Sequence, residues 1–311
     1  MARYVRISNI STSPLSIDNT CNYQEIVKQV KAHLDHSVQA VLPDRPDLIV
    51  LPEVCDRPAN LPQNDRNDYY KVRGTRILDY FKEVARNNNC YIAYSAVMED
   101  ENGVLRNSTR IIDRQGNIAG IYHKNHLVIE ENTVYGLAYG TEAPLIKCDF
   151  GTVACVICFD LNFDKLRLQY VEKKPEIILF SSMFHGGLMQ RYWAYSCRSY
   201  FVAATATRPG TIISPIGDII ASTTNYTEYV TADINLDYCI AHIDYNWEKF
   251  KALKKKYGRG VKIYDPGLLG SVLITSEMED KSIKDLVKEF EIELLDDYFK
   301  RALAHREKNI K

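Results

Sequence analysis

Short apolar runs alternate with helical patterns along most of the chain. Residues 47–53, 91–98, 153–158 and 176–182 are almost uninterrupted runs rich in β-branched residues, which is typical of strands buried on both faces. Helices are indicated where apolar residues recur three or four positions apart. The predicted helices are residues 22–41, 74–87, 166–173 and 189–200, and further strands are predicted at 4–10, 107–112, 118–122, 201–207, 210–214, 219–222 and 228–234. Residues 57–68, rich in Pro, Asn and Asp, are predicted to be a loop.

This order of elements predicts an α/β (α+β) fold in which two layers of sheet have helices outside each. We expect a four-layer α-β-β-α sandwich over residues 1–236. After residue 235 the composition changes: residues 245–257 are rich in lysine, and residues 282–308 are predicted to be one long amphipathic helix. Residues 237–311 are therefore predicted to be a C-terminal helical extension, too poor in strands to form a sheet of its own, that packs on the body or on a partner subunit.

The composition is that of an ordinary soluble protein and excludes several classes of function. Of the 311 residues, 46% are hydrophobic and 25% are charged, with 39 basic against 40 acidic side chains. A net charge of −1 favours neither a nucleic acid nor an anionic membrane surface as partner. No apolar run is long enough to cross a bilayer, and the first ten residues lack the apolar core of a signal peptide. We expect a cytoplasmic protein whose eight cysteines are reduced thiols.

Three reactive residue types follow three predicted strands. Glu53 ends LIVLPE, Lys124 ends GIYHK and Cys158 ends VACVIC. Taken singly, each is more often a solvated strand end or a small buried side chain. Together they supply a thiol nucleophile, a base to accept its proton and a cation to stabilise an oxyanion.

Cys158 also forms a C-x-x-C pair with Cys155, which raises the alternatives of a redox disulfide or a metal site. An offset of three along a strand points the two side chains to opposite faces, and no second C-x-x-C is present to complete a zinc site. His123 and His126 flank Lys124 with no third ligand in view. We therefore expect neither a metal nor a cofactor.

The segments that carry these residues resemble signatures of the nitrilase superfamily of carbon–nitrogen hydrolases. LPEVC at 51–55, HKNHL at 123–127 and FGTVACVICFDLNF at 150–163 are similar to its three motifs, in the family's order. SSMFHGG at 181–187, RYWAYSCRSYFVAATA at 191–206 and IISPIGDIIA at 212–221 also resemble it. The resemblance covers nearly all of residues 1–236.

The resemblance implies a Glu53–Lys124–Cys158 triad. Cys158 would attack the substrate carbon, Glu53 would be the general base, and Lys124 would stabilise the tetrahedral intermediate with help from the N–H of Phe159. The family often has a second glutamate between the lysine and the cysteine. Glu131 is preferred to Glu130 for this role, with a solvated acidic loop as the alternative. The pocket would be lined by Met183, Phe184 and His185.

The residues after the nucleophile bear on the reaction. Nitrilases proper usually read C-W-E and amidases or carbamoylases C-Y-D, so C-F-D at 158–160 favours amide hydrolysis. The resemblance thus implies a hydrolase of small linear amides or N-carbamoyl compounds, and a homo-oligomer. Nitrile hydrolysis and a non-catalytic scaffold or binding protein are the alternatives. Arg191 and Arg198 are candidates either for binding a substrate carboxylate or for structural ion pairs.

Overall fold

The computed structural model describes residues 1–18, 20–207 and 209–310, which form two compact units. The larger unit is Arg6–Asp233, and the smaller unit combines Met1–Val5 with Ile234–Lys311. The predicted division after residue 236 assigned the first five residues to the body, whereas the structure groups them with the C-terminal residues.

The larger unit is built on two six-stranded sheets, each with a parallel centre and antiparallel margins. The first has the order β12-β1-β2-β3-β4-β5, with β1, β2 and β3 parallel. Its strands are β1 (Tyr4–Ile10), β2 (Leu48–Val50), β3 (Tyr91–Glu99), β4 (Leu105–Ile112), β5 (Ile118–His123) and β12 (Tyr229–Asn235). The second has the order β11-β10-β9-β8-β7-β6, with β7, β8 and β9 parallel. Its strands are β6 (Ile146–Lys147), β7 (Thr152–Ile157), β8 (Ile177–Ser182), β9 (Tyr200–Thr205), β10 (Thr211–Ile213) and β11 (Ile219–Ser222).

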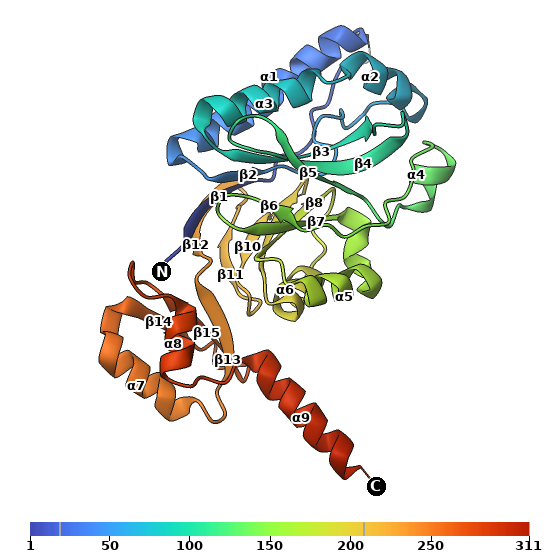
Figure 1. Ribbon diagram of the computed structural model, residues 1–311. Coiled ribbons are helices and arrows are strands. Elements are labelled where there is room, and N and C mark those ends of the chain that lie inside the picture. Colours follow the sequence, from blue (N-terminus) through green and yellow to red (C-terminus); the bar gives the residue numbers. More distant parts are fainter. Residues whose placement is uncertain (19, 208, 311) are drawn as a thin grey trace. The chain divides into compact units, whose positions relative to one another are not determined.

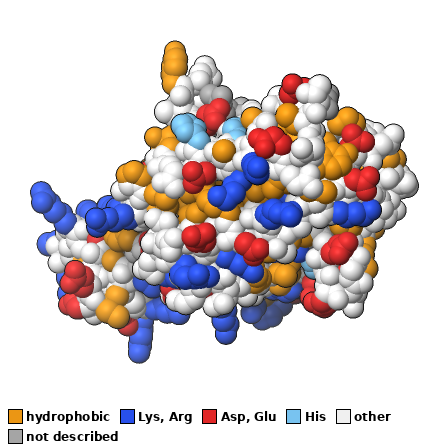
Figure 2. Space-filling view, turned by 90° about the horizontal axis from the view of Figure 1, so that it is seen from above, with side chains coloured by type: hydrophobic (Ala, Val, Ile, Leu, Met, Phe, Trp, Pro, Cys, Tyr) orange, Lys and Arg blue, Asp and Glu red, His pale blue; other side chains and the backbone are white. Residues whose placement is uncertain are grey.

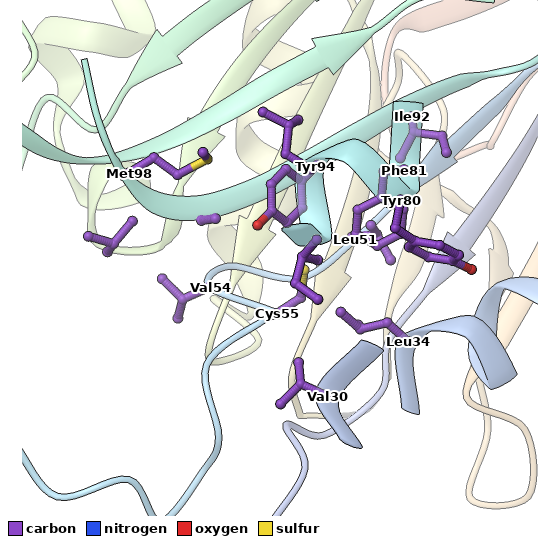
Figure 3. Packing of buried hydrophobic residues seen from close by; sticks show 14 of the residues in the cluster. Val30, Leu34, Leu51, Val54, Cys55, Tyr80, Phe81, Ile92, Tyr94 and Met98 are labelled. Carbon is purple, nitrogen blue, oxygen red and sulfur yellow. The ribbon is translucent and has the colours of Figure 1, made fainter. Parts of the chain in front are cut away.

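Helices cover the outer face of each sheet, which confirms the predicted sandwich. Helices α1 (Tyr23–Val41) and α3 (Arg76–Asn88) lie over the first sheet, and α5 (Asp164–Lys173) and α6 (Leu188–Cys197) lie over the second (Figure 1). Val30 and Leu34 of α1 and Phe81 of α3 pack with Ile92 and Tyr94 of β3 (Figure 3). The helical spacing in the sequence therefore corresponds to the stripe that each helix buries against its sheet.

The inner faces of the two sheets are joined by side chains that donate hydrogen bonds to backbone carbonyls. The Asn9 amide of β1 donates to the Ala203 carbonyl of β9 over 2.7 Å. The Ser181 hydroxyl of β8 donates over 2.8 Å to the carbonyl of Leu51, just beyond β2. These bonds satisfy polar groups that would be costly to bury unpaired, and they fix the strand ends of one sheet against the other.

The smaller unit corrects the expectation that the C-terminal residues lack a sheet. Strands β13 (Tyr238–His242), β14 (Val261–Tyr264) and β15 (Ser271–Ser276) form an antiparallel sheet in the order β13-β15-β14. Helix α7 (Trp247–Tyr257) and helix α8 (Ile283–Glu289) complete it, with Phe250, Leu253, Ile274 and Leu286 in a core of their own. The short strands escaped prediction because each is only four to six residues long.

Helical segments differ from the prediction in two further places. The single helix predicted at 282–308 is two helices, α8 and α9 (Leu295–Asn309), separated by a turn in which Glu291 has a φ of 51°. Helix α9 exposes Phe299 and Leu303, so a partner subunit that covers them stays a prediction. The predicted loop at 57–68 contains the start of helix α2 (Arg66–Arg73), which the polar composition concealed.

The surface agrees with the balanced composition. Figure 2 looks onto the molecule from above, and acidic and basic side chains are interspersed on this face rather than gathered by sign. Among the described residues, no helix combines the length and apolar character needed to span a membrane.

One buried ion pair ties α2 to the turn that follows β2. The Arg73 guanidinium lies 2.6 Å from the Asp56 carboxylate, and the two side chains are 2% and 0% exposed. Arg73 also donates to the Val97 carbonyl over 2.7 Å, and the Tyr94 hydroxyl donates to Asp56. Because Asp56 lies three residues after Glu53, this pair holds the turn from which Glu53 projects.

We expect Arg73→Met to lower the free energy of unfolding by about 3–5 kcal/mol, because it leaves the Asp56 charge buried without its partner. Urea unfolding followed by circular dichroism measures this change. Lys71→Met on the same helix is the matched control: Lys71 is exposed and pairs with the exposed Asp68, so little change is expected. Equal stability of the two variants would contradict the structural role of the Asp56–Arg73 pair.

Candidate active site

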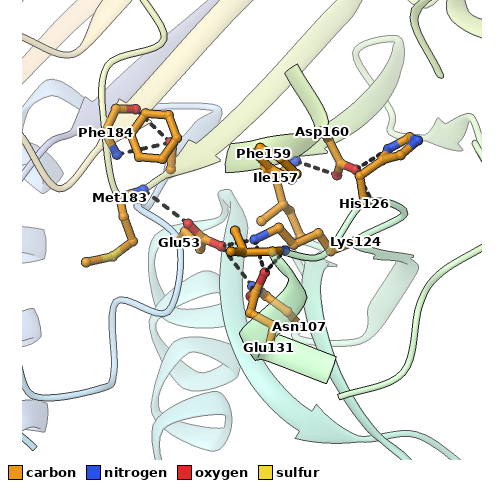
Figure 4. A network of polar contacts seen from close by, with 12 residues as sticks. Glu53, Asn107, Lys124, His126, Glu131, Ile157, Phe159, Asp160, Met183 and Phe184 are labelled. Carbon is orange, nitrogen blue, oxygen red and sulfur yellow. Dashed lines mark hydrogen bonds and ion pairs between the residues drawn. The ribbon is translucent and has the colours of Figure 1, made fainter. Parts of the chain in front are cut away.

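The structure brings Glu53, Lys124 and Cys158 together at one cavity. Glu53 follows β2, Lys124 follows β5, and Cys158 follows β7 of the other sheet. The Lys124 ammonium lies 2.9 Å from the Glu53 carboxylate (Figure 4), and Cys158 lines the same cavity, close enough to Glu53 for each residue to shift the pKa of the other. All three side chains are buried, with at most 4% exposed. The strand-end positions inferred from the sequence therefore meet in space.

Two residues at these strand ends adopt an uncommon backbone conformation. Cys158 has a φ of 49° as it opens the 3₁₀ turn Cys158–Asn162, and Val54, next to Glu53, has a φ of 42°. A positive φ is rare outside glycine and costs about 1–3 kcal/mol, most of all for a β-branched residue such as valine. These two backbone conformations turn the chain sharply after β2 and after β7.

Three donors hold the Glu53 carboxylate in its ionised form. Lys124 and Asn107 donate to Oε1 over 2.9 and 2.8 Å, and the backbone N–H of Met183 donates to Oε2 over 3.1 Å. Burial by itself raises the pKa of Glu53, but the Lys124 charge and the hydrogen bonds outweigh it, so the pKa lies below its ordinary 4.5. Glu53 is therefore a carboxylate, ready to accept a proton.

Lys124 lies between two carboxylates. Its ammonium contacts Glu131 Oε2 at 2.7 Å as well as Glu53. Burial lowers the pKa of Lys124, but the charges of Glu53 and Glu131, and that of Cys158 if ionised, hold the pKa well above its ordinary value. Glu131 lies in helix α4 (Ile129–Thr133) and also accepts the N–H of Val128 over 2.9 Å, whereas Glu130 is exposed. Of the two candidate glutamates, only Glu131 contacts Lys124.

The thiol of Cys158 is protonated in the resting site. Burial is the largest cause that raises the pKa of Cys158 above its ordinary 9.0, and the nearby Glu53 charge raises it further. Lys124 opposes both effects only in part. A neutral thiol thus lies beside an ionised base, and the proton must move when the sulfur attacks.

Asn107 belongs to this network, and the sequence analysis did not single it out. It is the third residue of β4, and its amide donates to both Glu53, over 2.8 Å, and Glu131, over 3.1 Å (Figure 4). The two carboxylates that flank Lys124 are therefore held by one amide as well as by the ammonium. No sequence motif predicts this role of Asn107, because the role arises from the pairing of β4 with β5, which places Asn107 beside Lys124.

Asp160 joins the cysteine turn to the lysine loop. Its buried carboxylate accepts the backbone N–H of His126 over 2.7 Å, the His126 ring at 2.9 Å and the Tyr122 hydroxyl over 2.7 Å. It also accepts the N–H of Ile157 over 3.1 Å. Asp160 therefore fixes the distance between the segments that carry Lys124 and Cys158.

The cavity has a volume of about 220 Å³ and opens beside Cys158. Of the residues predicted to bind substrate, Phe184 lines it, as does Met183. Phe159 and His185 are not among the lining residues, so their role in binding stays a prediction. Phe159 packs edge-on against Phe163 instead.

The two arginines suggested for a substrate carboxylate lie elsewhere. Arg191 donates to the Gly217 carbonyl over 2.6 Å and pairs with Asp218 at 3.5 Å, and Arg198 lies over the Tyr195 ring. Neither is among the residues that line the cavity.

Two observations on the described part of the chain concern the redox and metal alternatives. Cys155 is buried and, like Cys158, is a free thiol. No group of three or more His, Cys, Asp or Glu side chains within the described ranges is placed to hold a metal ion.

Comparison with known proteins agrees with this geometry. A family model described as carbon–nitrogen hydrolase matches residues 14–243. The deaminated glutathione amidase of Dictyostelium discoideum is 24% identical over 256 residues, which cover 71% of this chain and 86% of that protein. The omega-amidase NIT2 of Danio rerio is 21% identical over 260 residues, which cover 75% and 88%. Nit3 of Saccharomyces cerevisiae, a member of branch 10 of the nitrilase superfamily, has a similar fold, with a TM-score of 0.59, 19% identity, and coverage of 75% and 90%.

The protonated state of Cys158 is open to direct measurement. Its alkylation by iodoacetamide, followed by peptide mass spectrometry, should accelerate about tenfold per pH unit up to pH 9 without a plateau, because only the thiolate reacts. Glu53→Gln removes the negative charge and should speed labelling at a given pH, whereas Lys124→Met removes the positive charge and should slow it. A plateau near neutral pH would show instead that the thiolate is preformed.

Proposed function

The chain belongs to the carbon–nitrogen hydrolase family within the nitrilase superfamily, and we propose that it hydrolyses a small linear amide or N-carbamoyl compound through a thioester on Cys158. It is a thiol-dependent enzyme of the amidohydrolase type. The names of its relatives support an amide substrate, since they include a deaminated glutathione amidase and an omega-amidase. The single observation that carries the proposal is that Glu53, bonded to the Lys124 ammonium over 2.9 Å, and Cys158 line one cavity, where the Glu53 charge raises the pKa of the thiol.

In the first half of the reaction Cys158 attacks the amide carbon. Its proton passes to the Glu53 carboxylate at the same cavity. The carbonyl oxygen becomes an oxyanion, which the Lys124 ammonium stabilises together with the N–H of Phe159. Glu53 then gives its proton to the leaving nitrogen, so that ammonia or an amine departs and the acyl group remains on sulfur.

In the second half, water replaces the departed amine. Glu53 takes a proton from the water, whose oxygen attacks the thioester carbon and forms a second oxyanion near Lys124. Collapse of this intermediate expels the Cys158 sulfur, which recovers its proton from Glu53. The products are a carboxylic acid and the resting enzyme.

Glu131 keeps a negative charge beside Lys124 throughout the reaction. While Glu53 carries the thiol proton, Lys124 would lose one of its two anionic partners, but Glu131 remains 2.7 Å away. The negative charge moves from Glu53 to the oxyanion, so the total charge of the group does not change. A buried site tolerates such a transfer far better than the creation of a new charge.

A panel of small amides, N-carbamoyl compounds and nitriles, assayed for ammonia release, tests the proposal. We expect amides or carbamoyl compounds to be hydrolysed, Cys158→Ala to abolish turnover, and Glu53→Gln and Lys124→Met each to lower kcat/KM by about 10³-fold, not additively. Cys155→Ala, in strand β7 three residues before the nucleophile, is the matched control and should retain activity. Rapid quenching with intact-mass analysis should reveal an acyl adduct on Cys158.

The outcomes separate the alternatives. Preferred hydrolysis of nitriles would assign the nitrilase reaction to the same residues. Equal ammonia release by wild type and Cys158→Ala across the panel would exclude a thiol hydrolase and leave a binding or scaffolding role.

Asn107 should contribute to catalysis although it does not react. We expect Asn107→Ala to lower kcat by about 10- to 100-fold, because Glu53 and Glu131 lose the amide that fixes their positions beside Lys124. Thr109→Val, on the same strand face, is the matched control: the Thr109 hydroxyl is buried with no partner among the described residues. Equal activity of Asn107→Ala and wild type would mean that the ammonium alone orders the carboxylates.

A further inference from the structure

A second cavity borders the catalytic one, and the proposed reaction does not use it. Its volume is about 430 Å³, about twice the 220 Å³ of the cavity that opens beside Cys158. Its walls come from helix α2, from the turn that joins α2 to α3, from the end of β3 and from the start of β4. Among the described residues, Tyr70 of α2 is the only one that lines both cavities.

Helix α2 presents different residues to the two cavities. Arg66 and Tyr70, four positions apart, line the catalytic cavity, whereas Asn67 and Lys71 line the second. Residues four apart lie on one face of a helix, and a shift of one position turns a side chain by about 100° around the axis. Tyr70 therefore lies at the boundary between the face that borders one cavity and the face that borders the other.

The end of β3 divides the two cavities in the same way. Val97 lines the catalytic cavity, and Met98 lines the second. Successive side chains of a strand point to opposite faces of its sheet, so β3 separates the two spaces. Tyr70 is the side chain that the two spaces share.

The Tyr70 side chain is held firmly in this position. It is 6% exposed, the Arg73 guanidinium lies 5.3 Å from the centre of its ring, and the centre of the Tyr69 ring is 6.0 Å away. Both neighbours are anchored at Asp56: Arg73 pairs with its carboxylate, and the Tyr69 hydroxyl donates to its carbonyl over 2.6 Å. A ring packed against two anchored side chains forms a fixed wall rather than a moving gate.

The second cavity has no net charge to attract an ion. Arg73 is the buried charged residue of its lining, and all three guanidinium nitrogens already donate, one of them to Asp56. Lys71 and Glu99 are exposed and carry opposite charges. An uncharged chain therefore suits this cavity better than an ionic ligand.

The apolar part of the lining suits such a chain as well. Met98 is buried, Leu105 is half-buried, and the Tyr70 ring faces both spaces. Burial of an acyl chain against such a surface favours binding by about fourfold for each methylene group. The catalytic cavity alone is smaller than the roughly 300–1,000 Å³ typical of ligand sites, whereas the two cavities together fall within that range.

We infer that Tyr70 determines the length of the substrate: its ring ends the catalytic cavity, the acyl chain of the amide stops there, and removal of the ring joins the second cavity to the site. The inference rests on the proposed function. Tyr70 contacts the end of the substrate that is remote from Cys158 and takes no part in bond cleavage. It is a specificity-determining residue, and the second cavity is a preformed space for a longer uncharged chain.

A series of unbranched amides from propanamide to octanamide tests the inference on the wild-type enzyme. If N-carbamoyl compounds are the better substrates, the alkylureas of the same lengths replace the amides. We expect kcat/KM to rise with each methylene group until the chain reaches Tyr70, and to fall for longer chains. A continuous rise up to octanamide would overturn the inference but leave amide hydrolysis intact.

Variants of Tyr70 locate the limit. Tyr70→Ala should raise the ratio of kcat/KM for octanamide to that for propanamide at least about tenfold, chiefly through KM, and Tyr70→Phe, which keeps the ring, should keep the wild-type ratio. Tyr69→Leu is the matched control: Tyr69 is a buried aromatic residue of the same helix that lines neither cavity, so the ratio should not change. If Tyr70→Ala slows both amides by the same factor, Tyr70 is only structural and the inference fails. Circular dichroism checks folding, and Tyr70→Leu, with the same expected direction, serves if Tyr70→Ala does not fold.

Asn67→Trp tests whether the longer chain enters the second cavity. Asn67 is exposed and lines the second cavity but not the catalytic one, so the substitution fills only the former. Combined with Tyr70→Ala, it should return the ratio to that of the wild type. A ratio that stays as high as in Tyr70→Ala alone would show that the chain leaves by another path, and would overturn the inference.

A binding measurement keeps the two hypotheses separate. If no substrate is hydrolysed in a Cys158-dependent way, the proposed function fails, and calorimetric titration with octanamide still tests the wall. Octanamide should bind Tyr70→Ala at least about tenfold more tightly than it binds the wild-type protein. Equal binding to the two proteins, or binding to neither, refutes the inference.

Discussion

The buried ammonium of Lys124 is the constraint on which the rest of the site depends. A cation that is 2% exposed loses nearly all of its hydration, at a cost of several kcal/mol, and this cost must be offset by charges of the opposite sign. Glu53 and Glu131 supply them from two different segments, one after β2 and one in α4. The position of one side chain therefore holds together a strand end of the first sheet and the helix that borders the cavity.

The same pairing sets the protonation state of the nucleophile. Lys124 lowers the pKa of Cys158, but the two carboxylates that pair with Lys124 offset part of its positive charge. Glu53 also raises the pKa of the thiol directly. The resting site thus consists of a carboxylate and a thiol rather than a thiolate and a carboxylic acid. The basic group is ready before substrate arrives, and the nucleophile becomes reactive only as its proton leaves.

Much of the fold was predictable because buried strands and amphipathic helices leave clear periodicities. The apolar runs at 153–158 and 176–182 correspond to strands β7 and β8 to within one residue at each end, and Glu53, Lys124 and Cys158 follow strands that converge. Asn107 was missed because its importance comes from the pairing of β4 with β5, which no local pattern reports. Arg66, which lines the cavity, was missed for a related reason: it lies in a segment predicted to be a polar loop, and it is helix α2 that places it at the cavity. The sheet of the smaller unit was missed because three short strands, far apart in sequence, become recognisable only once paired.

Asp160 explains how two separate sheets hold reacting groups at hydrogen-bond distance. Cys158 and Lys124 belong to different sheets, so any sliding of one sheet past the other would separate them. The Asp160 carboxylate accepts the N–H of Ile157, immediately before the cysteine, and that of His126, two residues after the lysine. Strain at Cys158, with its φ of 49°, can persist because these bonds over-determine the turn. In the sequence, the aspartate of C-F-D indicated only amide chemistry. In the structure, Asp160 fixes the position of the nucleophile relative to the cation.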